Sequence, residues 1–297
     1  MNSFLENLFN KRDKAISDSS KTLYARNLTK LNGGESVTDL KFLNDMKKVL
    51  LIIDGYKPTT KRSFIIAACV VLKNNNEKLY QQYYELLSKM NTDLAVRTDK
   101  SETQRENWMD QDDVEKLLES LNVTKKVSNN DDYQKMLNHL ILSLYVLQIP
   151  RRNQDYCLMK IASDMTNTDF NYLDIKNKKF IFNNYKTDGK YKSVEIDIEE
   201  NMFKVIQRYL KFHPDKLKLK NKKYKVHFLV DFFNRPVDKS NDITKILNKV
   251  FGKKISSSML RNIYLSSKYS KMMNELKEDT SLMATSVSTA MNNYIKK

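Results

Sequence analysis

Two arginines in this sequence have the chemistry to bind a phosphate. Arg152 follows a strongly apolar segment in the run IPRRNQDYCLMKI, and Asp155 comes three residues later. Arg261 lies in KKISSSMLRNIYLSS beside an apolar stripe that includes Leu260 and Ile263. A buried arginine needs an anionic partner, and its planar fork of donors fits a phosphate as well as a core carboxylate. Two such arginines can clamp one phosphodiester, although a surface arginine or a core ion pair would give the same pattern.

A tyrosine near the end of the chain can supply a nucleophile. Tyr294 stands in SVSTAMNNYIKK, and a tyrosine oxygen can attack phosphorus to form a covalent intermediate. Alone, a tyrosine in this position more often packs or is exposed. Its interest comes from its combination with the two arginines.

The net charge favours a polyanionic partner. The 297 residues carry a formal charge of +16, spread over both halves of the chain. Lysine and arginine release counterions when they bind nucleic acid phosphates, although a solvated surface would explain the same charge. The densest basic run, KLKLKNKKYK, is either a solvated loop or a phosphate-contacting one, through Lys216, Lys218, Lys220, Lys222 and Lys223.

The sequence offers little to hold a cofactor. Cys69 and Cys157 lie in apolar surroundings, so we expect neither a disulfide framework nor a thiolate metal site. Glycine-rich phosphate loops and zinc-ligand spacings are missing. We therefore expect no metal and no cofactor. The sequence has no signal-peptide pattern and no apolar run long enough to span a bilayer, so we expect a location in the cytoplasm or nucleus without membrane contact.

The chain is expected to form two domains. Residues 1–90 predict a basic helical bundle, with helices over 17–31 and 38–53, from Pro58 onward, and over 77–90. The polar segment 91–107 is typical of an interdomain linker.

The second domain, 108–297, is expected to be mainly helical with a small antiparallel sheet. Helical spacing of apolar residues begins after the linker and returns around 202–210 and 243–250. Between them, KKFIFNNY and KSVEIDI alternate apolar and polar residues around the turn-forming TDG of 187–189, which predicts a β-hairpin.

Taken together, Arg152, Lys186, Arg261 and Tyr294 resemble, in order and interval, the tyrosine recombinase (phage integrase) family. Arg261 precedes Tyr294 by 33 residues, and Thr285 precedes it by nine, similar to the family's last two motifs. The resemblance implies that Asp155 supports the site and that Lys186, on the hairpin, protonates the leaving group. Lys190 and Lys192 are weaker candidates for that lysine.

The chain departs from the family at two positions. Ser258 stands where the family has the histidine of its histidine-x-x-arginine motif, and Thr285 replaces a histidine or tryptophan. The three histidines, at 139, 213 and 227, cannot be aligned with either position. Both hydroxyls can still bind phosphate, so the substitutions are compatible with a slow enzyme or with an inactive one.

The resemblance implies a function for the whole chain. A helical core-binding domain and a catalytic domain would close around double-stranded DNA, as a homo-oligomer that is tetrameric on DNA. Tyr294 would form a 3′-phosphotyrosyl intermediate and release a 5′-hydroxyl, conserving the bond energy needed for rejoining without ATP or metal. We expect a DNA strand-exchange or integration enzyme of a viral or mobile element.

Three other interpretations remain open at this stage. The first is a DNA-binding descendant of the same fold that no longer cleaves. The second is a type IB topoisomerase-like enzyme that relaxes supercoils as a monomer. The third is a helical protein-interaction module whose charge only keeps it soluble.

Overall fold

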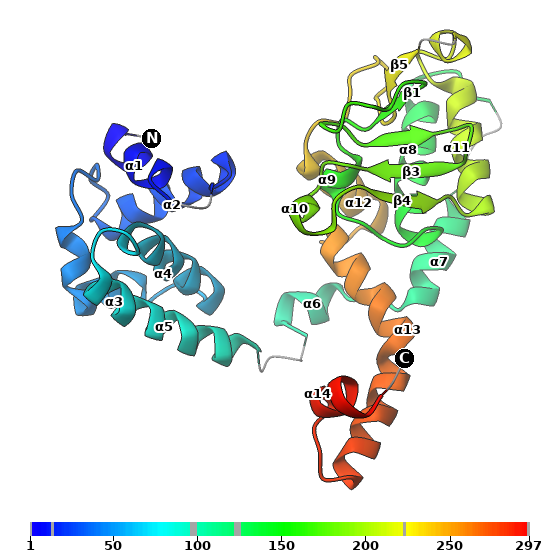
Figure 1. Cartoon of the computed structure of the whole chain (residues 1–297). Coiled ribbons are helices and arrows are strands. Elements are labelled where there is room, and N and C mark those ends of the chain that lie inside the picture. Colours follow the sequence, from blue (N-terminus) through cyan, green and yellow to red (C-terminus); the bar gives the residue numbers. More distant parts are fainter. Residues whose placement is uncertain (1, 13–14, 96–99, 122–125, 222–223, 296–297) are drawn as a thin grey trace. The chain divides into compact units, whose positions relative to one another are not determined.

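The computed structural model describes residues 2–12, 15–95, 100–121, 126–221 and 224–295 (Figure 1). The chain divides into two units between Lys100 and Ser101, within the segment that the sequence predicts as a linker. Part of that segment is helical: helix α5 continues to Ala95, and helix α6 spans Glu102–Asn107. Among the described residues, no helix is both long enough and apolar enough to span a membrane.

The first unit is a helical bundle around its own apolar core. Its α-helices begin after capping side chains such as Ser17, or with Pro58 in the first turn. The core contains fully buried Leu28, Ile65 and Tyr83. The elements are α1 (Ser3–Asn10), α2 (Asp18–Leu31), the 3-10 helix η1 (Lys41–Asn44), α3 (Met46–Ile53), α4 (Pro58–Leu72) and α5 (Glu77–Ala95).

The single helix expected over 38–53 is broken in two. Asp45 ends η1 and caps α3 by accepting a hydrogen bond from the Lys48 amide at 3.0 Å. The Tyr83 hydroxyl donates to the Leu43 carbonyl at 2.9 Å, which anchors the first piece to α5. A capping aspartate competes with continuation of a helix because its side chain satisfies the amides of a new first turn.

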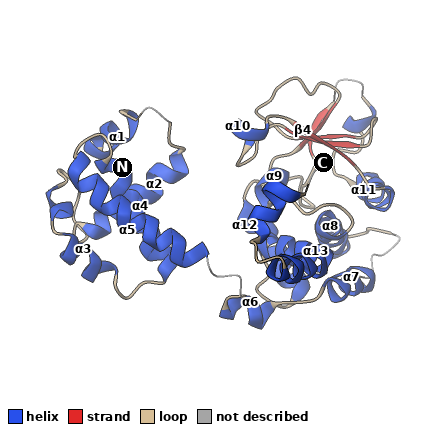
Figure 2. Ribbon diagram, turned by 60° about the horizontal axis from the view of Figure 1, so that its bottom comes forward, coloured by secondary structure: helices blue, strands red, loops and turns tan. Residues whose placement is uncertain are grey.

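The second unit is mainly helical and contains one small sheet, as the sequence predicts. In Figure 2, α8, α12 and α13 lie on one side of this sheet. The helices after α6 are α7 (Gln111–Ser120), α8 (Asn130–Val146), α9 (Asn153–Tyr156), α10 (Asp188–Tyr191), α11 (Glu200–Phe212), the 3-10 helix η2 (Lys218–Lys220), α12 (Ser240–Phe251), α13 (Ser257–Leu282), α14 (Val287–Thr289) and the π-helical η3 (Ala290–Tyr294).

The expected antiparallel sheet is in fact mixed. Its five strands have the order β4-β3-β2-β1-β5, and β1 pairs with β2 in parallel. The strands are β1 (Lys160–Ala162), β2 (Tyr172–Asp174), β3 (Lys179–Phe182), β4 (Val194–Asp197) and β5 (Lys225–His227). The segment 163–171 carries the chain back to the same end of the sheet, so β2 runs beside β1 in the same direction. Strands of three residues are too short to be predicted from alternation of apolar and polar residues.

The predicted hairpin is confirmed by the antiparallel pairing of β3 with β4. Phe180 and Phe182 of β3 are completely buried, which fits the alternation read from the sequence. The connection is longer than a tight turn, because TDG contributes to the start of α10 within a loop that covers 183–193. This β3–β4 loop contains Lys186.

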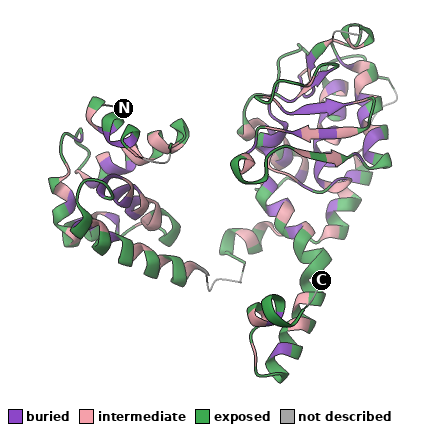
Figure 3. Cartoon of the chain, in the orientation of Figure 1, coloured by how far each residue is buried: buried purple, intermediate pink, exposed green. Residues whose placement is uncertain are grey.

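The long helix α13 has two different halves. Its first turns contribute Met259, Leu260 and Ile263 to the apolar core of the unit. Most of the remainder is exposed (Figure 3). Helix α14 packs beside this exposed half (Figure 1), and Ala290, the first residue of η3, is buried.

Candidate functional site

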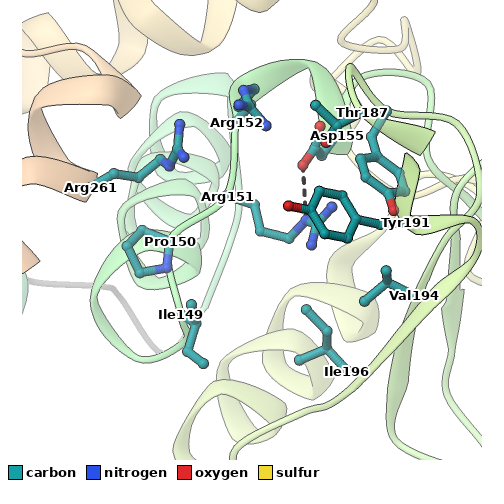
Figure 4. A pocket seen from close by; sticks show the side chains of 11 residues that line it. Ile149, Pro150, Arg151, Arg152, Asp155, Thr187, Tyr191, Val194, Ile196 and Arg261 are labelled. Carbon is teal, nitrogen blue, oxygen red and sulfur yellow. Dashed lines mark hydrogen bonds and ion pairs between the residues drawn. The ribbon is translucent and has the colours of Figure 1, made fainter. Parts of the chain in front are cut away.

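A pocket of about 260 Å³ lies in the second unit where three segments meet. The turn between α8 and α9, the first turns of α13 and the β3–β4 loop with strand β4 form its walls (Figure 4). The pocket brings together Arg152, Asp155 and Arg261, three of the residues singled out from the sequence. Its lining is Ile149, Pro150, Arg151, Arg152, Asp155, Tyr185, Thr187, Tyr191, Val194, Ile196 and Arg261.

Arg151 is a third arginine of this pocket, and it is firmly held. Its Nε donates to Oδ2 of Asp155 at 2.8 Å, and the side chains are 17% and 2% exposed. Its guanidinium lies 3.9 Å from the ring centre of Phe182 and 5.0 Å from that of Tyr185. The ion pair and the two aromatic contacts fix the guanidinium plane. The carboxylate of Asp155, which the resemblance implies to support the site, thus pairs with Arg151 and not with Arg152.

Arg152 and Arg261 have no such partner. Neither guanidinium forms an ion pair or side-chain hydrogen bond with any residue in the described part of the chain. Partial burial, followed by repulsion from Arg152, lowers the pKa of Arg261. Three cationic side chains and one carboxylate leave the pocket with an excess of positive charge. An anion would relieve this excess, because it would supply the missing acceptors and neutralise the repulsion.

Asp155 is buried where it lines the pocket, with its side chain 2% exposed. Burial raises the pKa of its carboxyl group, and the nearby Arg151 opposes that rise. Its Oδ2 accepts from Arg151, while Oδ1 is buried without a hydrogen-bond partner among the described residues. One carboxylate oxygen is therefore left without a donor among the described residues.

Asn171 connects the arginine-bearing turn to the β3–β4 loop. Its amide nitrogen donates to the main-chain carbonyls of Asp155 and Asn184, both at 2.8 Å. Its amide oxygen accepts from the main-chain amides of Asn183 and Asn184, also at 2.8 Å. Asn171 is 5% exposed, so these four bonds are made largely out of water. This single side chain fixes the turn and the loop relative to each other.

The β3–β4 loop carries three lysines predicted from the sequence, and none of them lines the pocket. Tyr185, buried beneath Arg151, closes the loop by donating its hydroxyl to the Lys192 carbonyl at 2.6 Å. Tyr185 and Thr187 line the pocket, and Lys186 lies between them in the chain with an exposed side chain. Lys190 and Lys192 are exposed as well. Of the three, Lys190 lies near a pocket residue, with its Nζ 5.1 Å from the centre of the Tyr191 ring.

Three other predicted residues do not line the pocket. Ser258 is exposed in the first turn of α13, and Thr285 lies between α13 and α14. Tyr294 ends η3, with 60% of its surface exposed. In Figure 1 this C-terminal segment lies beside the exposed half of α13, whereas Arg261 lies in the second turn of that helix.

The lysine-rich segment forms a different hollow. Lys216 and Lys220 line a groove of about 580 Å³ beside α11, together with apolar residues such as Leu210 and Leu217. Lys218 is 66% exposed and pairs with Asp215 at 2.7 Å. Lys222 and Lys223 lie outside the described residues.

Comparison with known proteins does not assign the chain to a family. No protein-family model matches the chain, and no curated protein matches it. In the part of the chain that the structure describes, no three His, Cys, Asp or Glu side chains gather as a metal site would require. The candidate site is therefore defined by its own residues, foremost Arg151, Arg152, Arg261, Asp155 and Asn171.

Proposed function

We propose that this protein cleaves and rejoins DNA through a covalent tyrosine intermediate, as a strand-exchange or integration enzyme of a viral or mobile element. One observation carries the proposal. Arg152 and Arg261 come from distant parts of the sequence, line the same pocket and lack an ion-pair partner among the described residues. A pair of guanidinium groups with spare donors suits the two non-bridging oxygens of a phosphodiester.

The pocket's charges support this chemistry. As a nucleophile adds to phosphorus, negative charge grows on the oxygens, and guanidinium groups already in position stabilise that charge. Arg151 and Asp155 would set the position of the turn that carries Arg152. In the proposed step the Tyr294 hydroxyl loses its proton to solvent, its oxygen forms a bond to phosphorus, and the bond from phosphorus to the 5′-oxygen breaks. Lys186 would give its proton to that leaving oxygen, and the reverse step rejoins the strand.

This step requires Tyr294 to move. From Arg261 to Leu282, α13 advances roughly 32 Å at its usual rise per residue. The segment Met283–Tyr294, fully extended, can span roughly 40 Å. A segment that leaves α13 is thus long enough to return Tyr294 to the arginines. The packing of α14 on α13 is shallow, because Ala290 is the only buried residue within 283–295, a range that the structure describes completely.

A second candidate function is DNA binding without cleavage. It is favoured by the separation of Tyr294 from the pocket and by Ser258 and Thr285 at the two histidine positions of the resemblance. This candidate retains the use of Arg152 and Arg261 as phosphate contacts. It differs only in forming no bond to DNA.

Formation of a covalent adduct distinguishes the two candidates. The purified chain is mixed in EDTA with nicked suicide duplexes taken from the DNA that flanks its own gene. Our proposal predicts an adduct that resists SDS in the wild type and is lost in Tyr294→Phe and Arg261→Gln. Tight retention of the duplexes without any adduct would favour the non-catalytic binder. Failure to retain DNA at all would contradict both candidates.

A further inference from the structure

The arginine pocket is too large and too apolar for a phosphate alone. Its volume of about 260 Å³ is many times the roughly 15 Å³ that a cavity needs to hold one water molecule. A phosphate held by Arg152 and Arg261 would therefore leave room beside it. The rest of the lining is mostly apolar or aromatic, with Ile149, Pro150, Tyr191, Val194 and Ile196.

Two of these apolar side chains are unusually exposed. Tyr191 of α10 is 59% exposed and Ile149, after α8, is 57% exposed. They come from different segments, and both line the pocket together with the arginines (Figure 4). Large apolar groups that rim a basic pocket mark a surface to which a partly apolar ligand binds.

The charges around Tyr191 narrow the class of ligand. Lys190 lies 5.1 Å from the centre of the Tyr191 ring, and Lys186 and Lys192 are exposed on the same loop. The ligand must then carry a negative group at the arginines and a flat apolar group that contacts the tyrosine. A nucleotide meets both requirements if its base is unpaired, because a base inside a duplex keeps its faces stacked on its neighbours.

We infer that the pocket binds a phosphate together with the unpaired nucleotide next to it, and that the base stacks on Tyr191. The inference rests on the proposed function, since it assumes that Arg152 and Arg261 hold a DNA phosphate. It adds a substrate preference: DNA with a single-stranded interruption binds more tightly than continuous duplex. Ile149 lines the pocket against the sugar or the neighbouring base.

Binding measurements with matched duplexes test this preference. The full-length protein is titrated, at one fixed salt concentration, into a fluorescein-labelled duplex with a short single-stranded gap and into the same duplex without the gap. Fluorescence anisotropy gives both dissociation constants. Base stacking on an aromatic side chain predicts that the wild type prefers the gapped duplex by about tenfold. Tyr191→Ala should abolish the preference, and Tyr191→Phe should keep it.

Control variants separate the possible failures. Tyr269→Ala removes another partly exposed tyrosine of the same unit, outside the pocket, and should leave the preference unchanged. Equal affinity for both duplexes, lost in Arg261→Gln, would overturn the inference and leave the proposed function standing. A preference that survives in Tyr191→Ala would overturn it as well. Failure of the wild type to bind either duplex would instead refute the proposed function.

A free nucleotide also carries a phosphate and a base, so a separate competition experiment tests it as the ligand. Deoxyadenosine monophosphate is titrated against the complex of the protein with the gapped duplex. Our inference predicts weak competition, because the flanking duplex adds phosphate contacts that a mononucleotide lacks. Displacement by an equimolar amount of the nucleotide would overturn the assignment to DNA and point to a free nucleotide as the ligand.

Discussion

The side-chain amide of Asn171 donates a hydrogen bond to the main-chain carbonyl of Asp155, with nitrogen and oxygen 2.8 Å apart. The same amide bonds to Asn184, so one buried residue joins the turn of Arg152 to the loop of Lys186. The geometry of the pocket therefore depends on a side chain that does not line it.

Replacing Asn171 should loosen the pocket. Asn171→Ala leaves main-chain groups of Asp155, Asn183 and Asn184 without partners, and each buried group left unsatisfied costs about 1–3 kcal/mol. We expect a lower melting temperature and faster hydrogen exchange at the amides of Asn183 and Asn184. Asn184→Ala is the matched control, because the Asn184 side chain makes only an exposed hydrogen bond, to the Asp169 carbonyl. Unchanged hydrogen exchange at these amides in Asn171→Ala would contradict the proposal that Asn171 holds the turn and the loop together.

The adjacent arginines should respond in opposite ways. Arg151→Met leaves the buried Asp155 carboxylate without its cation, which should lower the free energy of unfolding by about 3 kcal/mol. Arg152→Met removes a side chain without a described partner, so stability should change little while affinity for DNA falls. Chemical denaturation and anisotropy titrations of both variants measure the two quantities. A large loss of stability in Arg152→Met, with none in Arg151→Met, would contradict our assignment of Arg151 to stability and Arg152 to DNA binding.

Release of the C-terminal segment should accelerate adduct formation if Tyr294 must leave α13. Ala290→Glu places a charge at the buried first residue of η3, directly after α14, and an unpaired buried charge is costly enough to detach the segment. We expect the adduct to form several-fold faster than in the wild type. Ser288→Glu adds the same charge at an exposed position of α14 and should leave the rate unchanged. A slower rate in Ala290→Glu alone would mean that the packed segment is required for the reaction.

Acid should destabilise the second unit through His213. This residue is completely buried, and burial lowers the pKa of its ring. Its Nδ1 accepts from the Asp215 amide, so Nε2 donates to the His227 carbonyl in the neutral form. The unfolded chain then binds the proton more readily than the folded one. Stability is fully present above the ordinary pKa of 6.5 and falls as the pH drops through the lowered value.

His213→Gln removes this titration. Thermal melts of both proteins from neutral to mildly acidic pH should therefore show a smaller acid-side loss in the variant. An identical loss in both proteins would assign the effect to other groups, such as His139 and His227, whose pKa values are lowered by burial as well.

The sequence predicted the elements that have a strong local signal. The helical pattern, the hairpin and the basic character depend on residues close together in the chain. The parallel pairing of β1 with β2 depends on how the segment 163–171 returns, which no local pattern records. The break at Asp45 could not be predicted, because the sequence does not show that Asp45 caps a new helix.

The site was predictable only in part for the same reason. Arg152, Asp155 and Arg261 were identified by type and spacing, and the pocket brings all three together. Between two adjacent arginines, however, the sequence does not decide which one pairs with Asp155. That choice follows from Phe182 and Tyr185, which stack against Arg151. Asn171 has no signal at all in the sequence, since its partners are main-chain groups.

The identity of the residue that becomes bonded to DNA tests the central claim most directly. The adduct formed on a suicide duplex is digested with nuclease and trypsin, and the peptide that carries a nucleotide is identified by mass spectrometry. Our account predicts the nucleotide on Tyr294, joined through its 3′-phosphate. A nucleotide on any other residue would contradict the assignment of Tyr294, and duplex retained without a nucleotide-bearing peptide would contradict covalent cleavage.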